Sequence, residues 1–190
     1  MAKKKLSKDK WKQWEDRKKL ILSADFRLSD SSEAKEARIS RARKDYPYFV
    51  ETYFPHLCTN PETKEIIRSG KFQIDAAKYM KANRHTRAVF EWARGHAKST
   101  HISLMIPIWL MIQEIRTIHV MVLVSKSEDS ADRLLSDLQC ELQFNTLLKQ
   151  DFGIEIDEGN WSTGEFMTKD GMLFISLGRG QSPRGIKNRG

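Results

Sequence analysis

The chain has 190 residues, a hydrophobic content of 39% and a formal net charge of +8. This length suffices for a domain with a buried core, and the composition is that of an ordinary globular protein. The densest apolar stretch, residues 102–112, is too short to cross a bilayer, and the first residues lead into charge rather than into an apolar signal core. These features argue against a membrane protein and predict a soluble, cytoplasmic one.

The positive charge is concentrated at the front of the chain. Residues 1–48 hold 15 Lys and Arg against 8 Asp and Glu, whereas the remainder holds 18 against 17. Such a basic arm is typical of a solvated tail, and it can also lie along a phosphate backbone by releasing counterions. The solvated tail is the favoured interpretation, because few aromatic residues are interleaved with these charges.

The first part of the chain predicts helices joined by an aromatic connector. The expected helices span residues 8–22, 29–43 and 60–70. Ser31 or Ser32 caps the second helix, and the segment 46–55 concentrates aromatic residues around two prolines, as in a buried connector. We therefore expect a basic helical region over residues 1–60, followed by a second domain over residues 61–190.

Beyond residue 86 the pattern changes to alternating strand and helix. The run 88–92 predicts a short buried strand that ends in a turn of small residues. The apolar residues 99–113 predict a buried helix, which Pro107 bends. A strand, a small-residue turn and a helix in this order form the context in which phosphate-binding loops occur.

A second strand and helix follow directly. Residues 117–124 are β-branched and almost continuously apolar, as in a central parallel strand covered on both faces. Ser125 and Glu128 have the spacing of a capping box, and Ala and Leu then recur on one helical face up to Leu142. The succession of strands and helices predicts an α/β fold with a parallel sheet and flanking helices.

The last part of the chain predicts a β-hairpin that extends this sheet. Residues 165–168 and 172–177 flank Asp170-Gly171, a favoured two-residue turn. The tail 178–190 has four glycines, four cations and no acidic residue, which is typical of a loop on an anionic surface. We expect the sheet to be incomplete in this chain.

Cysteine and histidine residues do not predict a metal site. Cys58 and Cys140 have no paired spacing and no neighbouring His or Cys, so two reduced thiols are expected. His96 and His101 are five residues apart and lack a third ligand nearby.

The segment 92–100 combines the residue types of a phosphate-binding loop. Backbone N–H groups at the start of a helix can surround phosphates, Lys98 can reach the β and γ oxygens, and Ser99 or Thr100 can offer a hydroxyl to Mg²⁺. Trp92 stands where the first glycine of the usual motif belongs, and Ala97 replaces the glycine before the lysine. On spacing alone, an ordinary helix start remains an equal alternative.

At residues 93–100 the sequence resembles the deviant Walker A motif of phage large terminase subunits, the ATPases that package DNA. The family carries an arginine early in this loop, and the resemblance implies that Arg94, four residues before Lys98, senses the γ-phosphate or assists its cleavage. The alternative is that Arg94 neutralises a carboxylate such as Glu91. A cation in a phosphate cradle stabilises developing negative charge, which favours the phosphate role and makes Arg94 and Lys98 the expected catalytic pair.

Two further segments resemble the same family. Residues 71–73 are similar to its adenine-recognising Q motif, in which Gln73 would pair with the adenine edge and Phe72 would supply apolar or stacking contact. Residues 178–185 resemble the segment that precedes Walker B in one terminase group. The expected nucleotide-binding residues are Phe72, Gln73, Arg94, Gly95, His96, Ala97, Lys98, Ser99 and Thr100, with the Ser99 hydroxyl on Mg²⁺.

The resemblance covers only the first motifs of the terminase family. A Walker B strand ending in Asp and Glu, a coupling motif and a metal-dependent nuclease domain would come next, and we expect none of them within residues 61–190. Asp157 and Glu158 belong to a half-exposed alternation and are expected on a surface strand or loop. We therefore expect this partial P-loop NTPase domain to bind ATP and to hydrolyse it negligibly.

The resemblance implies a role in a viral or prophage DNA-packaging motor inside the bacterial host cell. The intact ATPase would drive double-stranded DNA into a procapsid, with a small terminase subunit and a portal protein as partners and several copies in the motor. Two alternatives stay open. One is a noncatalytic nucleic-acid-binding module with a degenerate loop, and the other is a helicase-like P-loop motor. The sequence does not assign DNA-contacting residues.

Overall fold

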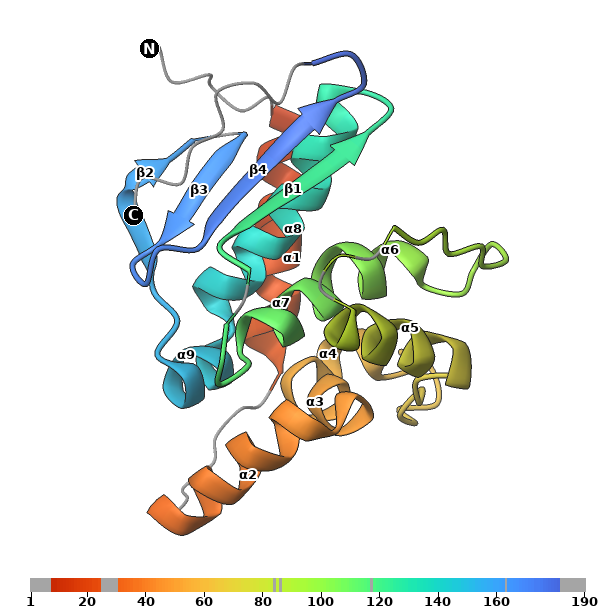
Figure 1. Ribbon diagram of the computed structural model, residues 1–190, viewed down its shortest axis with the longest axis vertical. Coiled ribbons are helices and arrows are strands. Elements are labelled where there is room, and N and C mark those ends of the chain that lie inside the picture. Colours follow the sequence, from red (N-terminus) through yellow and green to blue (C-terminus); the bar gives the residue numbers. More distant parts are fainter. Residues whose placement is uncertain are drawn as a thin grey trace. The chain divides into compact units, whose positions relative to one another are not determined.

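The computed structural model describes residues 8–24, 31–83, 85, 87–116, 118–162 and 164–181, and it has the predicted α/β class (Figure 1). The chain divides into two compact units. We call Met1–Ser23 with Ile118–Gly190 the sheet unit, and Ala24–Thr117 the helical unit. These units reflect packing alone, so the functional division at residue 60 stays a prediction. None of the described helices combines the length and the apolar character that a bilayer crossing requires.

The sheet unit is built on a mixed four-stranded sheet. Its strands are β1 (Val120–Ser125), β2 (Ile156–Trp161), β3 (Glu165–Thr168) and β4 (Leu173–Gly178), in the order β1-β4-β3-β2. β1 pairs with β4 in parallel, and β3 is antiparallel to both of its neighbours. The predicted hairpin of β3 and β4 is confirmed, and Gly171 in its turn has a φ of +84°. The sheet is therefore parallel only in part.

The expectation that β1 is central is wrong for the described sheet. β1 lies at one end of the strand order, and Val122 and Val124 are 38% and 65% exposed. A continuous apolar run indicates side chains suited to burial, but the number of neighbouring strands is set by residues elsewhere in the chain.

Helix α8 (Glu128–Phe144) covers the sheet with its apolar face, and α9 (Thr146–Phe152) follows it. The face consists of Ala131, Leu135, Leu138 and Leu142, all with no exposed surface. The N-cap is Ser127, whose hydroxyl accepts from the Ser130 N–H at 3.2 Å, and not the predicted Ser125. Since β1 runs through Ser125, that residue has a strand conformation and the helix begins after it.

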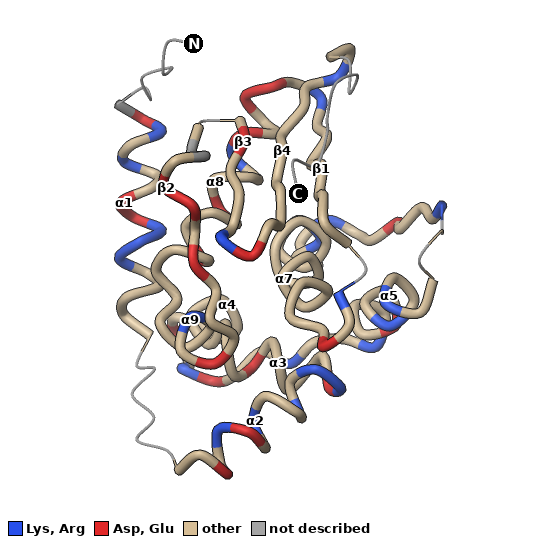
Figure 2. Tube along the Cα trace, turned by 60° about the vertical axis from the view of Figure 1, so that its left-hand side comes forward, with Lys and Arg blue, Asp and Glu red and all other residues tan. Residues whose placement is uncertain are grey.

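Helix α1 (Lys8–Ser23) packs along α8 and confirms the predicted first helix. Figure 2 shows acidic and basic residues interspersed along α1. Two of the basic residues form ion pairs with α8. Lys10 Nζ lies 2.7 Å from Asp129 Oδ1, and Arg17 contacts Glu141 at 3.5 Å. The basic front of the chain is thus partly neutralised by contacts within the sheet unit.

The helical unit has an aromatic core. Its helices are α2 (Ser32–Lys44), α3 (Tyr46–Tyr53), α4 (Pro55–Cys58), α5 (Lys71–Ala82), α6 (Lys98–Thr100), the π-helix η1 (His101–Met105) and α7 (Ile106–Met111). Ser31 caps α2 as predicted, by accepting from the Ala34 N–H. The expected connector is buried: Phe49 and Phe54 have no exposed surface, and the Trp109 indole donates to the Ala42 carbonyl at 2.8 Å.

Two expected elements of the helical unit are wrong. Residues 60–70 form a turn and a bridge instead of a helix, because the Asn60 side chain accepts from the Glu62 and Thr63 N–H groups and so competes with helical hydrogen bonds. Residues 88–92 form no strand, and Val89 is 85% exposed. An apolar run forms a strand only when a partner strand supplies its hydrogen bonds.

The two thiols are free and buried, as predicted for reduced cysteines. Cys58 lies in the helical unit and Cys140 in the sheet unit, where its Sγ is 4.0 Å from the Trp14 carbonyl. Burial raises the pKa of each thiol to about 12.

The end of β4 lies directly against the start of α8 at Gly178. A Cβ at this position would stand 2.5 Å from the Glu128 nitrogen and 3.0 Å from its Cα. The Gln181 side chain secures the contact, because it accepts from the Gly178 N–H at 2.7 Å and donates to Glu128 at 3.1 Å. Glycine is therefore required here by close backbone approach.

Gly178→Ala should destabilise the protein by about 1–3 kcal/mol, because the new methyl group meets rigid backbone. Gly159→Ala is the matched control, since its Cβ would lie 3.3 Å from a carboxylate oxygen at the end of a side chain, and its effect should stay within about 0.5 kcal/mol. Urea unfolding of both variants measures the difference. Equal stabilities would contradict the close approach.

Candidate functional site

Residues 92–100 of the helical unit line a cavity of about 550 Å³. Arg94, Lys98 and Ser99 are exposed, whereas Trp92 and Thr100 are half-buried. The loop leads into a helical run made of α6, η1 and α7, which corresponds to the predicted helix over residues 99–113. A concave loop at the start of a helix can present several backbone N–H groups to one ligand.

The loop backbone has positive φ angles at Gly95 and Ala97. Gly95 has a φ of +88°, and Ala97, with a φ of 51° and a ψ of 31°, is left-handed directly before Lys98, the first helical residue of α6. A left-handed residue followed by a right-handed one turns successive N–H groups toward one point, which is the geometry of an anion-binding nest. Ala97 thus adopts the left-handed conformation for which glycine is usual, at a cost of about 1 kcal/mol.

The helical run after the loop contains a π-helical turn directly before Pro107. Pro107 lies in the first turn of α7, and the residue four positions before it, Ser103, lies within the π-helix η1. A proline has no N–H for the carbonyl four residues earlier, so the predicted disturbance occurs on its N-terminal side. π-helical turns are frequent at functional sites, and this one begins at His101, directly after the loop.

Two cations of the loop have no partner among the residues that the structure describes. Within the described part of the chain, neither Arg94 nor Lys98 forms an ion pair or a side-chain hydrogen bond. Arg94 is therefore not neutralised by Glu91, the alternative that the sequence left open. Both cations remain available for an anion in the cavity. Among the described residues, no group of His, Cys, Asp or Glu side chains could hold a metal ion by itself.

Helix α5 fixes the loop through the residues of the predicted Q motif. Gln73 is 7% exposed; its Oε1 accepts from the Gly70 N–H at 2.7 Å, and its Nε2 donates to the His96 carbonyl at 3.0 Å. The Phe72 ring lies edge-on to Trp92 and His96, with centroid distances of 5.1 and 5.3 Å. The structure thus brings Phe72 and Gln73 to the loop. Both ends of the Gln73 amide bond to backbone groups, which leaves one N–H for a ligand.

A buried Tyr46–His101 pair supports the helix behind the loop. The two side chains meet at 2.7 Å through the Tyr46 hydroxyl and His101 Nδ1, and Trp92 packs edge-on to the same imidazole at 6.2 Å. Burial lowers the pKa of His101 to about 4, so the ring is neutral at pH 7 and shares one hydrogen with the Tyr46 hydroxyl. Sequence reasoning missed this pair, since no motif links residues 55 positions apart.

The remaining predicted segments belong to the sheet unit. Only residues 178–181 of the segment 178–185 are described, and the rest of the basic tail lies outside the described residues. Asp157 and Glu158 lie on β2, at one end of the described strand order, and Glu158 is exposed. The sequence analysis predicts a surface strand or loop for these two residues, and they lie on such a strand.

No protein-family model matches the chain, and a search of curated proteins finds no match either. A functional assignment therefore depends on the residues and on the loop geometry. Positive φ angles at Gly95 and Ala97, two unpaired cations and a hydroxyl at Ser99 all lie within one cavity. This arrangement is suited to a polyanion.

The His101 pair predicts a pH dependence of stability. The pKa of His101 is about 4 in the folded chain against 6.5 normally, so between these values the unfolded chain binds a proton that the folded chain lacks. The contribution of neutral His101 to the stability of the folded chain is complete above pH 6.5 and decreases as the pH falls toward 4. His101→Gln should reduce this decrease, because its amide keeps a partner for Tyr46 and does not titrate. Urea unfolding at pH 7 and pH 5 compares the two chains, and identical pH slopes would refute the assignment.

Proposed function

We propose that residues 92–100 bind the phosphates of ATP with Mg²⁺, and that the chain is the ATP-binding portion of a DNA-packaging ATPase of the large terminase type. The loop backbone is the observation that carries the proposal: left-handed conformations at Gly95 and Ala97 precede an unpaired Lys98 at the start of a helix. This combination provides convergent N–H groups and a mobile cation, the two features that bind a triphosphate.

Each loop residue has a distinct role in this proposal. Lys98 contacts the β and γ oxygens, and the Gly95, His96 and Ala97 backbone surrounds them. Arg94 lies four residues earlier and is equally unpaired, so it can add positive charge at the γ-phosphate, where negative charge develops during cleavage.

In this proposal the start of α6 would hold magnesium. The exposed Ser99 hydroxyl would be its protein ligand, and the half-buried Thr100 would assist. Mg²⁺ keeps several waters and takes further ligands from the substrate phosphates, so one hydroxyl fits its chemistry better than a closed protein cage. When bound, the ion would neutralise negative charge on the phosphates.

The adenine preference is supported by the aromatic residues beside the loop. Phe72, at 41% exposure, lies against Trp92 and His96 and offers an apolar surface next to the phosphate cavity. A planar base can pack on such a surface. Gln73 retains one amide hydrogen for the base, although its main bonds are to the loop and to Gly70.

The wider biological role follows from the resemblance of three motifs in the same order along residues 71–185. In that role the parent protein is a P-loop ATPase and nuclease encoded by a phage or prophage, active in the bacterial cytoplasm. Double-stranded DNA is its substrate for translocation, a small terminase subunit and a portal protein are its partners, and several copies form the motor.

Lys98→Ala should reduce affinity for ATP·Mg²⁺ by at least about tenfold, because the loop loses its mobile cation. Isothermal titration calorimetry on the complete chain measures the change. Lys78→Ala is the matched control, since Lys78 is an exposed lysine on α5 of the same unit, and it should bind ATP as the parent does. Equal affinity for ATP·Mg²⁺ in the parent and in a folded Lys98→Ala chain would contradict the phosphate-loop proposal.

Gln73→Ala should weaken ATP, GTP and tripolyphosphate alike through the loop, because it removes the bond that holds the His96 carbonyl, and should weaken ATP further because the amide hydrogen offered to adenine is lost. Gln73→Glu is the sharper variant: it keeps an acceptor for the Gly70 N–H and loses the donor to His96. Competition binding with the three ligands separates two roles. A loss confined to ATP would assign Gln73 to adenine recognition instead of loop positioning.

A further inference from the structure

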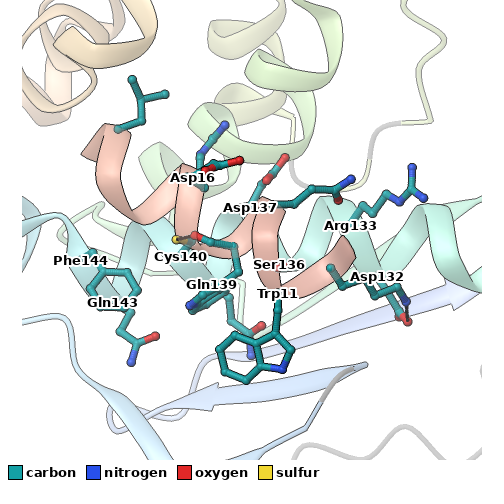
Figure 3. A pocket seen from close by; sticks show the side chains of 15 residues that line it. Trp11, Asp16, Asp132, Arg133, Ser136, Asp137, Gln139, Cys140, Gln143 and Phe144 are labelled. Carbon is teal, nitrogen blue, oxygen red and sulfur yellow. Dashed lines mark hydrogen bonds and ion pairs between the residues drawn. The ribbon is translucent and has the colours of Figure 1, made fainter. Parts of the chain in front are cut away.

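A second cavity, of about 680 Å³, lies within the sheet unit between α1 and α8 (Figure 3). This volume is in the range of small-molecule sites, which is about 300–1,000 Å³. The phosphate-loop proposal involves none of the residues that line it. Any ligand of this cavity is therefore a separate feature of the protein.

Aromatic side chains form part of the cavity wall. Trp14 and Phe144 pack edge-on with a centroid distance of 5.9 Å and fix each other in place. Trp11, one turn before Trp14 on α1, remains 51% exposed at the same cavity. An indole held on a helix with a free face is a surface on which a planar ring can stack.

Two amide groups of the cavity lining each have one buried atom without a hydrogen-bond partner among the described residues. Gln139 is 4% exposed, and its Nε2 has no hydrogen-bond partner within the described structure. Gln143 follows one turn later on α8, and its Oε1 is likewise buried without a partner there. A buried polar atom without a partner costs about 1–3 kcal/mol. A ligand that accepts from Gln139 and donates to Gln143 would recover this cost.

The charges around the cavity are balanced. Three cationic and three acidic side chains line it: Lys10, Arg17, Arg133, Asp16, Asp132 and Asp137. Two of them are engaged in ion pairs with residues outside the lining, since Lys10 pairs with Asp129 at 2.7 Å and Arg17 with Glu141 at 3.5 Å. Because the lining charges are equal in number and opposite in sign, the lining favours a ligand without net charge.

We propose that the cavity between α1 and α8 binds a neutral nucleobase, which stacks on Trp11 and pairs through adjacent acceptor and donor atoms with Gln139 and Gln143. Every nucleobase carries an acceptor and a donor side by side on its pairing edge, and its ring is planar and uncharged. A free nucleoside and a base of a single strand share this chemistry.

Calorimetric titration of the complete chain with adenosine and guanosine tests the proposal. Neither probe carries phosphate, and the titrations are repeated in Phe72→Ala, which removes the apolar surface offered to adenine beside the loop, so that the helical unit does not contribute. We expect saturable binding in both backgrounds. Trp11→Ala should weaken it about tenfold, as for loss of a stacking platform, and Gln139→Leu about three- to tenfold.

Leu22→Ala is the control, because Leu22 is 54% exposed on the same helix but lies outside the cavity lining, and it should bind nucleosides as the parent does. Gln139→Leu removes an unpaired buried amide, so we expect it to fold, and its urea unfolding is measured in parallel. A short single-stranded oligonucleotide that displaces adenosine identifies a strand as the source of the base, and failure to displace it identifies a free nucleoside. Absence of saturable binding, or affinities unchanged by both cavity variants, would overturn the proposal.

Discussion

Helix α8 holds the sheet unit together because both the sheet and α1 pack against it. Its apolar face, which includes Leu135 and Leu138, is fully buried. On α8 the Glu141 carboxylate is 0% exposed and pairs with Arg17 of α1. A buried carboxylate without such a partner costs several kcal/mol, so this pair fixes α1 although the two residues are more than a hundred positions apart in the sequence. The nucleobase cavity exists only because α1 is held there.

The sequence predicts those parts of the fold that short-range chemistry decides. Asp170-Gly171 specifies its own hairpin turn, and Ser31 caps its helix with a group three residues away. Elements that need distant partners are predicted less well. Residues 88–92 have the composition of a strand and lack a described neighbour to pair with, and β1 is as apolar as a central strand although it has one described neighbour. Composition indicates which segments are suited to burial, whereas the pairing of strands depends on residues throughout the chain.

The candidate site shows the same division. Residue types and their order predict the loop and the association of Phe72 and Gln73 with it, and both side chains do contact the loop. The left-handed backbone of Ala97 could not be predicted, because alanine rarely adopts it and nothing local requires it. The role of Gln73 in supporting the loop could not be predicted either, because its amide partners depend on the position of α5 relative to the loop.

Each unit contains one buried cysteine, whose alkylation rate reports how often that unit opens. Only a thiolate reacts rapidly with an alkylating reagent, and Cys58 and Cys140 both have a pKa near 12 while buried. Labelling at neutral pH is therefore limited by the opening of the surrounding structure, which restores an ordinary thiol. Because Cys58 lies in the helical unit and Cys140 in the sheet unit, peptide-resolved alkylation rates report the opening of the two units separately in one experiment. A ligand that stabilises one unit would therefore slow the alkylation of the cysteine in that unit and leave the other rate unchanged.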